Sequence, residues 1–236
     1  MRVIQSLTLF VLIFVAESSA QGADCVILLH GLARTSASME KAAVAFEEAG
    51  YEVVNVDYPS RKFSIEVLAP LAIEKGLVKC PSNSVIHFVT HSLGGILVRY
   101  YLEQKEISNL GRVLMLAPPN KGSEVVDGLR RFPGYEVING PAGLQLGTSE
   151  DSIPLTLGAV DYEVGVIAGT RTFNPLLSQY LSNPDDGKVS VENTKVEGMT
   201  DFIVVPSSHP FIMKSSVVID QAILFIKTGR FAHDTH

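Results

Sequence analysis

A serine followed closely by two glycines marks the end of an apolar run in this sequence. The hexapeptide Thr90-His91-Ser92-Leu93-Gly94-Gly95 ends the run Val85–Thr90, and a helix-like pattern begins behind it. A nucleophilic serine must project from a sharp turn between a strand and a helix. Small neighbours relieve the crowding of that turn, which explains the pattern Gly-x-Ser-x-Gly. Thr90 replaces the first glycine and adds bulk, but the strand before and the helix after still predict Ser92 as a nucleophile.

A serine nucleophile needs a general base, and in one recurring arrangement the chain order is serine, carboxylate, histidine. Of the six histidines, His209 alone lies downstream of Ser92 in a loop directly after a predicted strand, so we predict His209 as the base. His30 stands at the end of an early strand beside a glycine, which favours a structural role over catalysis. The other histidines lie in the strand before Ser92, in its turn, or in a polar tail: His87, His91, His233 and His236.

The acid that orients the base is expected in a turn after the fifth predicted strand. That turn reads Asn183-Pro184-Asp185-Asp186-Gly187-Lys188-Val189, and its residue types hold a carboxylate at the carboxyl edge of a sheet. Asp186, next to Gly187, is the predicted acid, and Asp185 remains the alternative.

Two backbone N–H groups should be aimed at the oxyanion that forms when a serine attacks a carbonyl. One is expected from Leu93, the residue after the nucleophile. The other is expected from the loop that ends the first strand, Leu28-Leu29-His30-Gly31-Leu32, with Leu32 as the donor.

Short apolar runs alternate with helix-like segments, a pattern typical of an α/β fold with a parallel sheet covered on both faces. The predicted strands are Val26–His30, Tyr51–Asp57, Ser84–Thr90, Arg112–Leu116, Glu163–Ala168 and Asp201–Val205. The predicted helices are Ser38–Ala49, Ser64–Gly76, Leu93–Lys105 and Ser215–Thr228. The sequence therefore predicts about six mainly parallel strands with helices on both faces.

Two segments interrupt this rhythm. Residues 118–160 are rich in glycine and proline, and residues 170–188 show neither strand nor helix periodicity. Long irregular excursions from compact domains are often lids or binding loops, and ordered surface connections are the alternative. No linker-like composition divides the chain, so residues 21–236 are expected to form a single domain.

The first twenty residues resemble a secretory signal peptide. Arg2 gives a positive start, Val3–Ala16 is almost wholly apolar, and small residues precede a cleavage site after Ala20. An uncleaved anchor is the alternative, but the run is shorter than the roughly 20 residues that span a bilayer. We therefore expect an exported protein, either periplasmic or secreted.

Charge excludes one class of partner. The formal net charge is −6, and the lysines and arginines are scattered along the sequence. No basic surplus is available to neutralise phosphates, so nucleic acid is not an expected partner.

These residues resemble the bacterial lipase and esterase branch of the α/β-hydrolases. Val26–Leu32 is similar to the strand and oxyanion loop of that family, Ser92 to its nucleophile, and Leu116–Ser123 to the loop after the next strand. Asp186-Gly187-Lys188-Val189 and His209 are similar to the acid turn and the base loop. The resemblance implies a minimal α/β-hydrolase fold that lacks the two leading strands. It also implies ester hydrolysis through an acyl-enzyme without a cofactor.

Further details follow from the resemblance. The single-glycine loop His30-Gly31-Leu32 resembles that of lipases acting on medium or long acyl chains. Calcium-dependent secreted lipases carry an aspartate two residues after the histidine, whereas this chain has Phe211, so no metal is expected there. In this fold the first and third strands are parallel neighbours. With only two cysteines in an exported protein, a Cys25–Cys80 disulfide is predicted at the edge opposite the catalytic residues.

The expected partner is a small-molecule acyl ester or a lipid, and transient contact with a lipid surface is left open. Two other functions remain alternatives. An acyltransferase or thioesterase would use the same three residues, and a binding protein would keep the scaffold without catalysis. Such inactive scaffolds usually lose one of the three residues, and none is missing here.

Overall fold

The computed structural model describes residues 23–172 and 174–233, so the predicted signal peptide lies outside the described residues. The sheet is parallel throughout, with the strand order β2-β1-β3-β4-β5-β6. Every predicted strand is present, with ends that shift by at most two residues. The strands are β1 (Cys25–Leu29), β2 (Glu52–Val56), β3 (Ile86–His91), β4 (Leu110–Leu116), β5 (Val164–Gly169) and β6 (Asp201–Val205).

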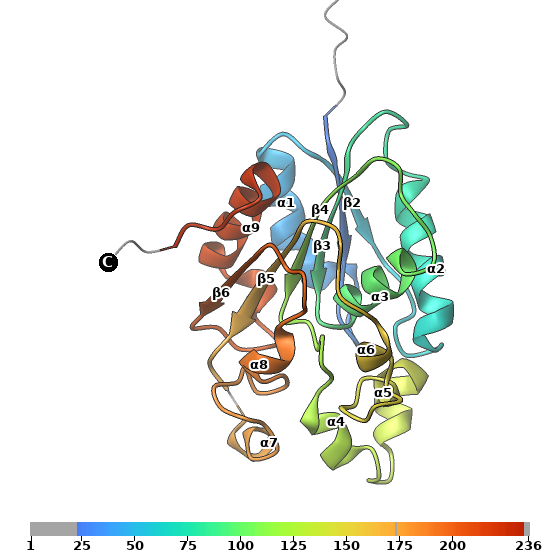
Figure 1. Ribbon diagram of the computed structural model, residues 1–236, viewed down its shortest axis with the longest axis vertical. Helices are drawn as coiled ribbons and strands as arrows, with labels where there is room; N and C mark the ends of the chain where they lie inside the picture. The colour runs from blue at the N-terminus through green and yellow to red at the C-terminus, as the bar shows by residue number, and fades with distance from the viewer. Residues whose placement is uncertain (1–22, 173, 234–236) are drawn as a thin grey trace, which may run out of the picture.

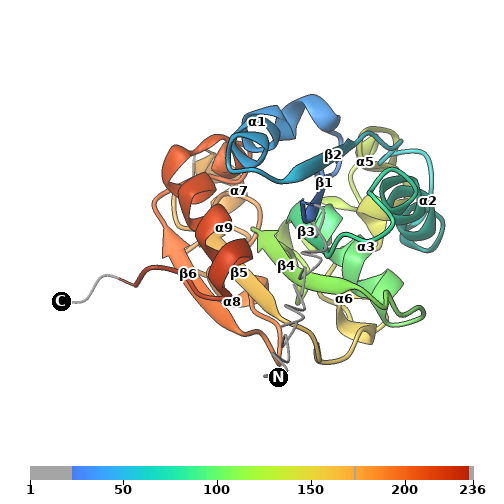
Figure 2. The same ribbon diagram turned by 90° about the horizontal axis from the view of Figure 1, so that it is seen from above.

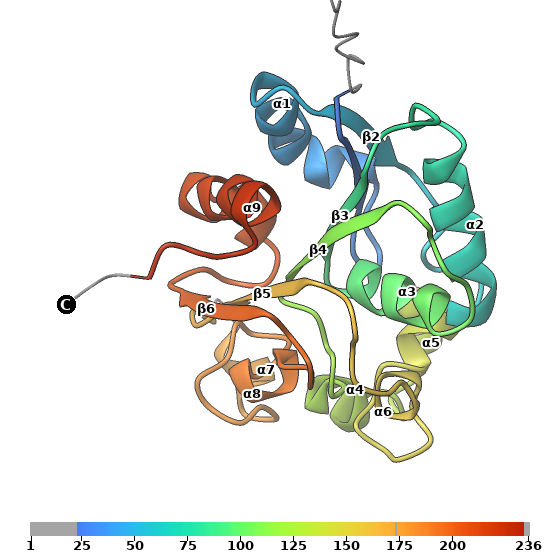
Figure 3. The same ribbon diagram turned by 45° about the horizontal axis from the view of Figure 1, so that its top comes forward.

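Helices cover both faces of this sheet, as predicted (Figure 2). Helices α1 (Glu40–Glu48) and α9 (Ser216–Thr228) lie on one face, and α2 (Ile65–Leu77) and α3 (Leu93–Leu102) lie on the other (Figure 3). Strand β1 shows why two hydrophobic cores form. Ile27 and Leu29 pack into the core under α2 and α3, while Val26 and Leu28 pack into the core under α1 and α9. Successive strand residues point to opposite faces, so β1, which is buried on both sides, is apolar throughout.

Residues 118–160 are not irregular throughout, as their glycine- and proline-rich sequence suggested, because three short helices occur there: α4 (Glu124–Leu129), α5 (Tyr135–Leu144) and α6 (Ile153–Thr156). Glycine and proline interrupt the helices before a period can be recognised. Within α5, Gly140 has φ +67° and is followed by Pro141. In residues 170–172 and 174–188, the single turn α7 (Pro175–Ser178) is the only helix. With α8 (Val191–Thr194), these helices gather below the carboxyl ends of the strands (Figure 1). The described residues also contain two 3₁₀ helices, η1 (Ser36–Met39) and η2 (Ile212–Lys214).

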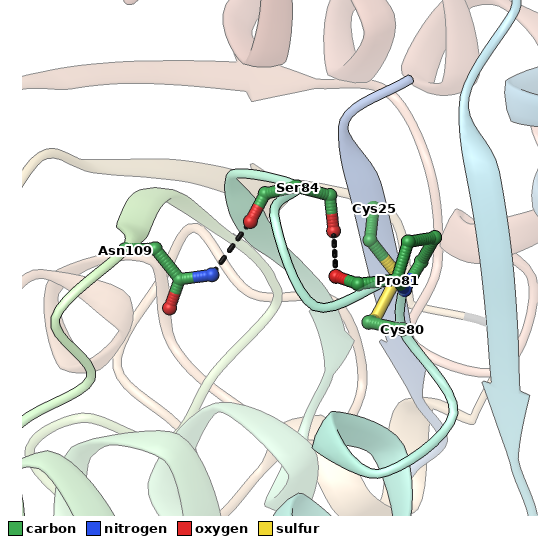
Figure 4. Close-up of a disulfide and its surroundings, with 5 residues drawn as sticks. All are labelled: Cys25, Cys80, Pro81, Ser84 and Asn109. Carbon is green, nitrogen blue, oxygen red and sulfur yellow. Dashed lines mark hydrogen bonds between the residues drawn. A yellow bond between two sulfur atoms is a disulfide. The ribbon is translucent and has the colours of Figure 1, made fainter. Parts of the chain in front are cut away.

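Cys25 and Cys80 form a disulfide bond, which confirms the predicted pairing (Figure 4). Cys25 opens β1, and Cys80 lies in the loop before β3, so the bond is at the amino edge of the sheet. Asn109 Nδ2 donates to the Ser84 carbonyl at 2.6 Å and Ser84 Oγ donates to the Pro81 carbonyl at 2.8 Å, which orders the same loop. The bond is therefore part of the scaffold and is remote from the loops that follow β3 and β6.

We expect the double variant Cys25→Ala/Cys80→Ala to unfold at a lower urea concentration, with a loss of about 2–4 kcal/mol in free energy of unfolding. The bond closes a chain segment with a sequence separation of 55, and cross-linking such a segment restricts the unfolded chain. Urea titration with and without reductant checks this. Reductant should destabilise the wild type and leave the double variant unchanged. Equal stability of the oxidised wild type and the double variant would contradict the prediction.

Within the parts of the chain that the structure describes, no helix is long and apolar enough to cross a membrane.

Candidate active site

Ser92 occupies the turn between β3 and α3. Its φ of +52° and ψ of −119° lie in a region that residues with side chains rarely adopt, as expected at a strained nucleophile turn. The bulk of Thr90 is accommodated because its side chain is buried and its Oγ1 donates to the Leu114 carbonyl of β4 at 3.2 Å. Gly94 is required by packing, since a Cβ there would lie 2.7 Å from the Leu29 carbonyl oxygen.

The structure brings Ser92, His209 and Asp186 into one hydrogen-bonded chain. His209 Nε2 lies 3.0 Å from Ser92 Oγ, and His209 Nδ1 lies 2.7 Å from Asp186 Oδ2. The other carboxylate oxygen of Asp186 accepts from the backbone N–H groups of Lys188 and Val189 at 3.0 and 2.8 Å. Asp186 is fully buried and these donors compensate its lost hydration. With Nδ1–H directed at Asp186, Nε2 of His209 is free to accept the proton of Ser92.

Asp185, the alternative acid, points elsewhere. Its Oδ1 accepts from the Gly187 backbone N–H at 2.7 Å, and its Oδ2 accepts from Ser178 Oγ. These bonds close the turn and tie it to α7. Of the two adjacent carboxylates, Asp186 alone contacts His209.

The two predicted oxyanion donors lie beside Ser92. Leu32 lines the same cavity as Ser92, and Leu93 is the first residue of α3. Neither backbone N–H has a hydrogen-bond acceptor among residues 23–172 and 174–233. Gly31 lets the loop approach the turn, since a Cβ there would lie 3.2 Å from Ser92 Cβ. Both amides are therefore available to an incoming oxygen atom.

His30 is engaged within its own loop. Its ring stacks on Tyr58 with 4.0 Å between the ring centroids, its Nδ1 lies 2.9 Å from the Gly31 carbonyl, and its Nε2 accepts from the Tyr58 backbone N–H. A neutral ring with the proton on Nδ1 satisfies both bonds. Burial lowers the pKa of His30, which favours that neutral form. These contacts agree with the structural role expected from the sequence.

His91 has a role that the sequence analysis did not identify. Its Nε2 donates to the backbone carbonyl of His209 at 3.0 Å and so holds the loop that carries the base. Its Nδ1 is buried and has no hydrogen-bond partner in the described residues. Burial first, and the neighbouring His209 second, lower the pKa of His91 well below its ordinary value. The position beside Ser92 was visible in the sequence, but the contact with a loop 118 residues away was not.

We expect His91 to make the fold acid-sensitive between pH 7.5 and 5.5. A histidine whose pKa is lowered by folding stays neutral in the native state and takes up a proton on unfolding, so stability falls as the pH drops below the unfolded value of 6.5. For a group that remains neutral when folded, the loss over this interval is about 1.4 kcal/mol.

Urea unfolding of wild type and His91→Asn at both pH values measures this loss. The variant should be less stable at both, yet its stability should fall by about 1.4 kcal/mol less than that of the wild type. Parallel losses in the two proteins would show that His91 is not the group responsible.

A cavity of about 310 Å³ opens above Ser92 and His209. Ile138 and Asn139 of α5 and Leu177 of α7 line it, so both interrupted segments of the sequence contribute to its wall. The remaining lining residues are Leu32, Ala33, Arg34, His91, Gly187, Lys188 and Pro210. Sequence periodicity could not place Ile138 or Leu177 here, because both lie on short helices outside the sheet.

No group of three or more histidine, cysteine or acidic side chains in the described residues is placed to hold a metal ion. The arrangement around Ser92 is suited to attack on a carbonyl carbon, with a serine nucleophile, an oriented imidazole and two open amides.

No family model matches the chain, and no curated protein matches its sequence. Solved structures do resemble it. The mature lipase BlEst2 of Bacillus licheniformis matches with a TM-score of 0.66 at 16% identity, over 88% of this chain and 92% of that one. The metagenomic carboxyl esterase MGS0156 matches with a TM-score of 0.65 at 19% identity, over 89% of this chain and 76% of that one.

Phospholipase PlaB from Legionella pneumophila matches with a TM-score of 0.55 at 20% identity. The match covers 73% of this chain and 46% of that one. Such identities establish a shared fold rather than a shared substrate. This chain therefore has the α/β-hydrolase fold of bacterial lipases and esterases, in a version with six parallel strands.

Proposed function

We propose that this protein hydrolyses carboxylic esters through an acyl-enzyme formed on Ser92. The observation that carries the proposal is the hydrogen-bonded chain from Ser92 through His209 to Asp186 at the base of a cavity. The same arrangement, on an α/β-hydrolase fold, activates serine as a nucleophile. The lipases and esterases that share the fold support ester hydrolysis as the reaction class.

Each side chain has a defined role in the proposed mechanism. His209 takes the Ser92 proton as Oγ attacks the ester carbonyl carbon, and Asp186 stabilises the imidazolium that results. The amides of Leu32 and Leu93 donate to the oxyanion. His209 then gives the proton to the departing alcohol. In the second half, His209 removes a proton from water as the water oxygen attacks the acyl carbon. The bond between that carbon and Ser92 Oγ then breaks, His209 returns the proton to Oγ, and the acid leaves.

Exposed apolar side chains around the cavity support an acyl chain as the bound group. Val137 and Ile138 of α5 are 84% and 62% exposed, and Leu176 of α7 is 70% exposed. Ile138 lines the cavity, and Val137 and Leu176 are each adjacent in sequence to a lining residue. Apolar groups gathered beside a site often mark a contact with a ligand or a lipid surface. We infer an ester with an apolar acyl chain, and we assign residues 118–160 to substrate binding.

We also infer export of a single domain formed by residues 21–236. The signal-peptide pattern of residues 1–20 supports export, and the Cys25–Cys80 disulfide is compatible with an oxidising compartment. Mass spectrometry of the protein from the periplasm and the medium tests this inference. A mature chain that begins after Ala20 would support it, and an intact amino terminus in the cytoplasm would overturn it.

A fluorophosphonate probe with peptide mapping tests the proposed reaction. Labelling at Ser92 in the native protein, absent in Ser92→Ala and after urea denaturation, is the expected result. Turnover of p-nitrophenyl esters of graded chain length then tests the substrate class. Labelling at another residue would overturn the assignment of Ser92. Failure of both labelling and ester turnover would favour a binding protein on this scaffold.

A further inference from the structure

Two cationic side chains line the cavity above Ser92. Arg34 follows the oxyanion loop, and Lys188 follows Gly187 in the acid turn. The other titratable residues of the cavity wall are His91, which burial keeps neutral, and His209. No aspartate or glutamate lines this cavity. The wall beside the nucleophile is therefore positively charged.

The positive charge continues into a second cavity of about 390 Å³. It shares Ala33 and Arg34 with the first, and Arg61 and Lys214 are among its other lining residues. Again no carboxylate lines the wall. Four cations thus gather along two adjoining cavities of a protein whose formal net charge is −6. We call Arg34, Arg61, Lys188 and Lys214 the cationic cluster.

The cationic cluster has no carboxylate partner. Within residues 23–172 and 174–233, none of its four side chains makes an ion pair or a side-chain hydrogen bond. Lys188 is half-buried, and its pKa is lowered first by that burial and then by Arg34. Asp186 acts in the opposite direction, but its oxygens already accept from His209 and from two backbone amides.

Lys188 is a half-buried cation without an ion-pair partner, which is costly unless a ligand brings the counter-charge, because partial burial removes its hydration. Arg34, Arg61 and Lys214 are exposed, so their charges are accessible to the same ligand. The apolar wall formed by Ile138 and Leu177 suits an acyl chain, and the cationic cluster suits an anion on the other part of the ester. Arginine and lysine beside each other are suited to phosphate, which offers several acceptor oxygens.

We propose that the substrate is an anionic ester whose alcohol part carries a phosphate that binds the cationic cluster, with Arg34 and Lys188 next to the reacting ester. This proposal rests on the proposed ester hydrolysis at Ser92. It adds a charged recognition site to the apolar one. The carbonyl lies at Ser92, the acyl chain along α5 and α7, and the phosphate toward Arg34.

Two esters that differ by one phosphate test the proposal directly. These are 1-octanoylglycerol and 1-octanoylglycerol 3-phosphate, both used below the concentration at which they aggregate. The wild type should favour the phosphate ester in kcat/KM by about tenfold or more at low ionic strength, since a charge-assisted contact contributes roughly that factor. Added salt should reduce the preference.

The ratio of the two kcat/KM values is the readout in each variant, so general damage to catalysis cancels. Arg34→Gln and Lys188→Gln should each lower the ratio several-fold, and the double variant should bring it near one. Lys227→Gln is the matched control. This substitution removes one exposed charge from α9. Lys227 follows Ile226, whose carbonyl accepts from Arg112 of β4 near the amino edge of the sheet. The substitution should therefore leave the ratio unchanged.

The outcomes separate this proposal from the proposed function. Hydrolysis of 1-octanoylglycerol that needs Ser92, with a wild-type ratio near one, would overturn the anionic substrate and keep the ester hydrolase. A high ratio that survives in the double variant would also overturn it. The octanoyl ester of lactate supplies a carboxylate arm, and a preference for that ester alone would overturn the assignment to phosphate. Absence of hydrolysis of all esters and of probe labelling would refute the proposed function itself.

Discussion

Replacing Ser92 by alanine is expected to lower kcat for a neutral p-nitrophenyl ester by about 10⁶-fold, and His209→Ala by a similar factor. In the proposed mechanism the hydroxyl and the imidazole act as one unit, since the proton would pass across the 3.0 Å contact between Oγ and Nε2. The double variant should therefore be no slower than either single variant. Steady-state rates, with active sites counted by probe labelling of the wild type, provide the measurement. Retention of even one tenth of kcat in Ser92→Ala would remove Ser92 from the mechanism.

Asp186→Asn should reduce kcat by about 10⁴-fold with little change in the fold. The amide can still occupy the space, but its NH₂ group cannot accept from His209 Nδ1, so the imidazole loses the tautomer that accepts the serine proton. Both backbone donors to Asp186 belong to its own turn, which limits rearrangement.

Asp185→Asn is the matched control for this prediction. Asp185 is adjacent, almost equally buried and also closes the turn, but it contacts Gly187 and Ser178 instead of His209. We expect Asp185→Asn to lower stability by about 1–2 kcal/mol and to keep kcat within about tenfold of the wild type. Reversed effects of the two substitutions on kcat would make Asp185 the acid.

The second large effect is expected at Arg99, where substitution by methionine should lower the free energy of unfolding by about 3–5 kcal/mol. Arg99 is only 4% exposed and lies on α3, the helix that begins after Ser92. Its guanidinium donates to the Asn120 carbonyl, the Leu157 carbonyl and the Gly158 carbonyl, each at 3.0 Å. These acceptors stand at the two ends of the excursion formed by residues 118–160. Methionine would fill much of the volume but leave the buried Asn120 carbonyl and the partly buried Leu157 carbonyl without this donor.

Arg230→Met is the control for the loss of an arginine side chain in general. Arg230 also donates to a backbone carbonyl, that of Thr200, but its side chain is exposed. We expect this substitution to change stability by less than about 1 kcal/mol. The stability of Arg99→Lys should lie between those of Arg99→Met and Arg230→Met, since one ammonium group cannot reproduce the planar fork of a guanidinium. Urea unfolding compares the variants, and limited proteolysis should cut Arg99→Met first within residues 121–156. Equal stability of Arg99→Met and Arg230→Met would show that Arg99 does not anchor the excursion.

Sequence patterns predicted the sheet closely because its strands are runs of mostly apolar residues. The strands buried on both faces carry few polar residues, and those of β3 (His87, Thr90 and His91) are hydrogen-bonded, so each run is visible without knowledge of its neighbours. The short helices of residues 118–160 escaped prediction because α4 and α6 are brief and α5 is interrupted at Gly140. Their positions depend on anchors such as Arg99, and a side-chain contact with distant carbonyls leaves no periodic signal.

The sequence by itself determined the strand order along the chain, the strand-turn-helix context of Ser92, and the candidacy of His209 as the one histidine after a late strand. These features are local, or follow from chain order. Only the tertiary structure decided which of Asp185 and Asp186 faces His209, because adjacent side chains in a turn point in different directions. It also decided that His91 holds the base loop and that Arg34 and Lys188 share one cavity wall. Those contacts join segments far apart in the chain, and their geometry exists only once the sheet has brought the loops to one edge.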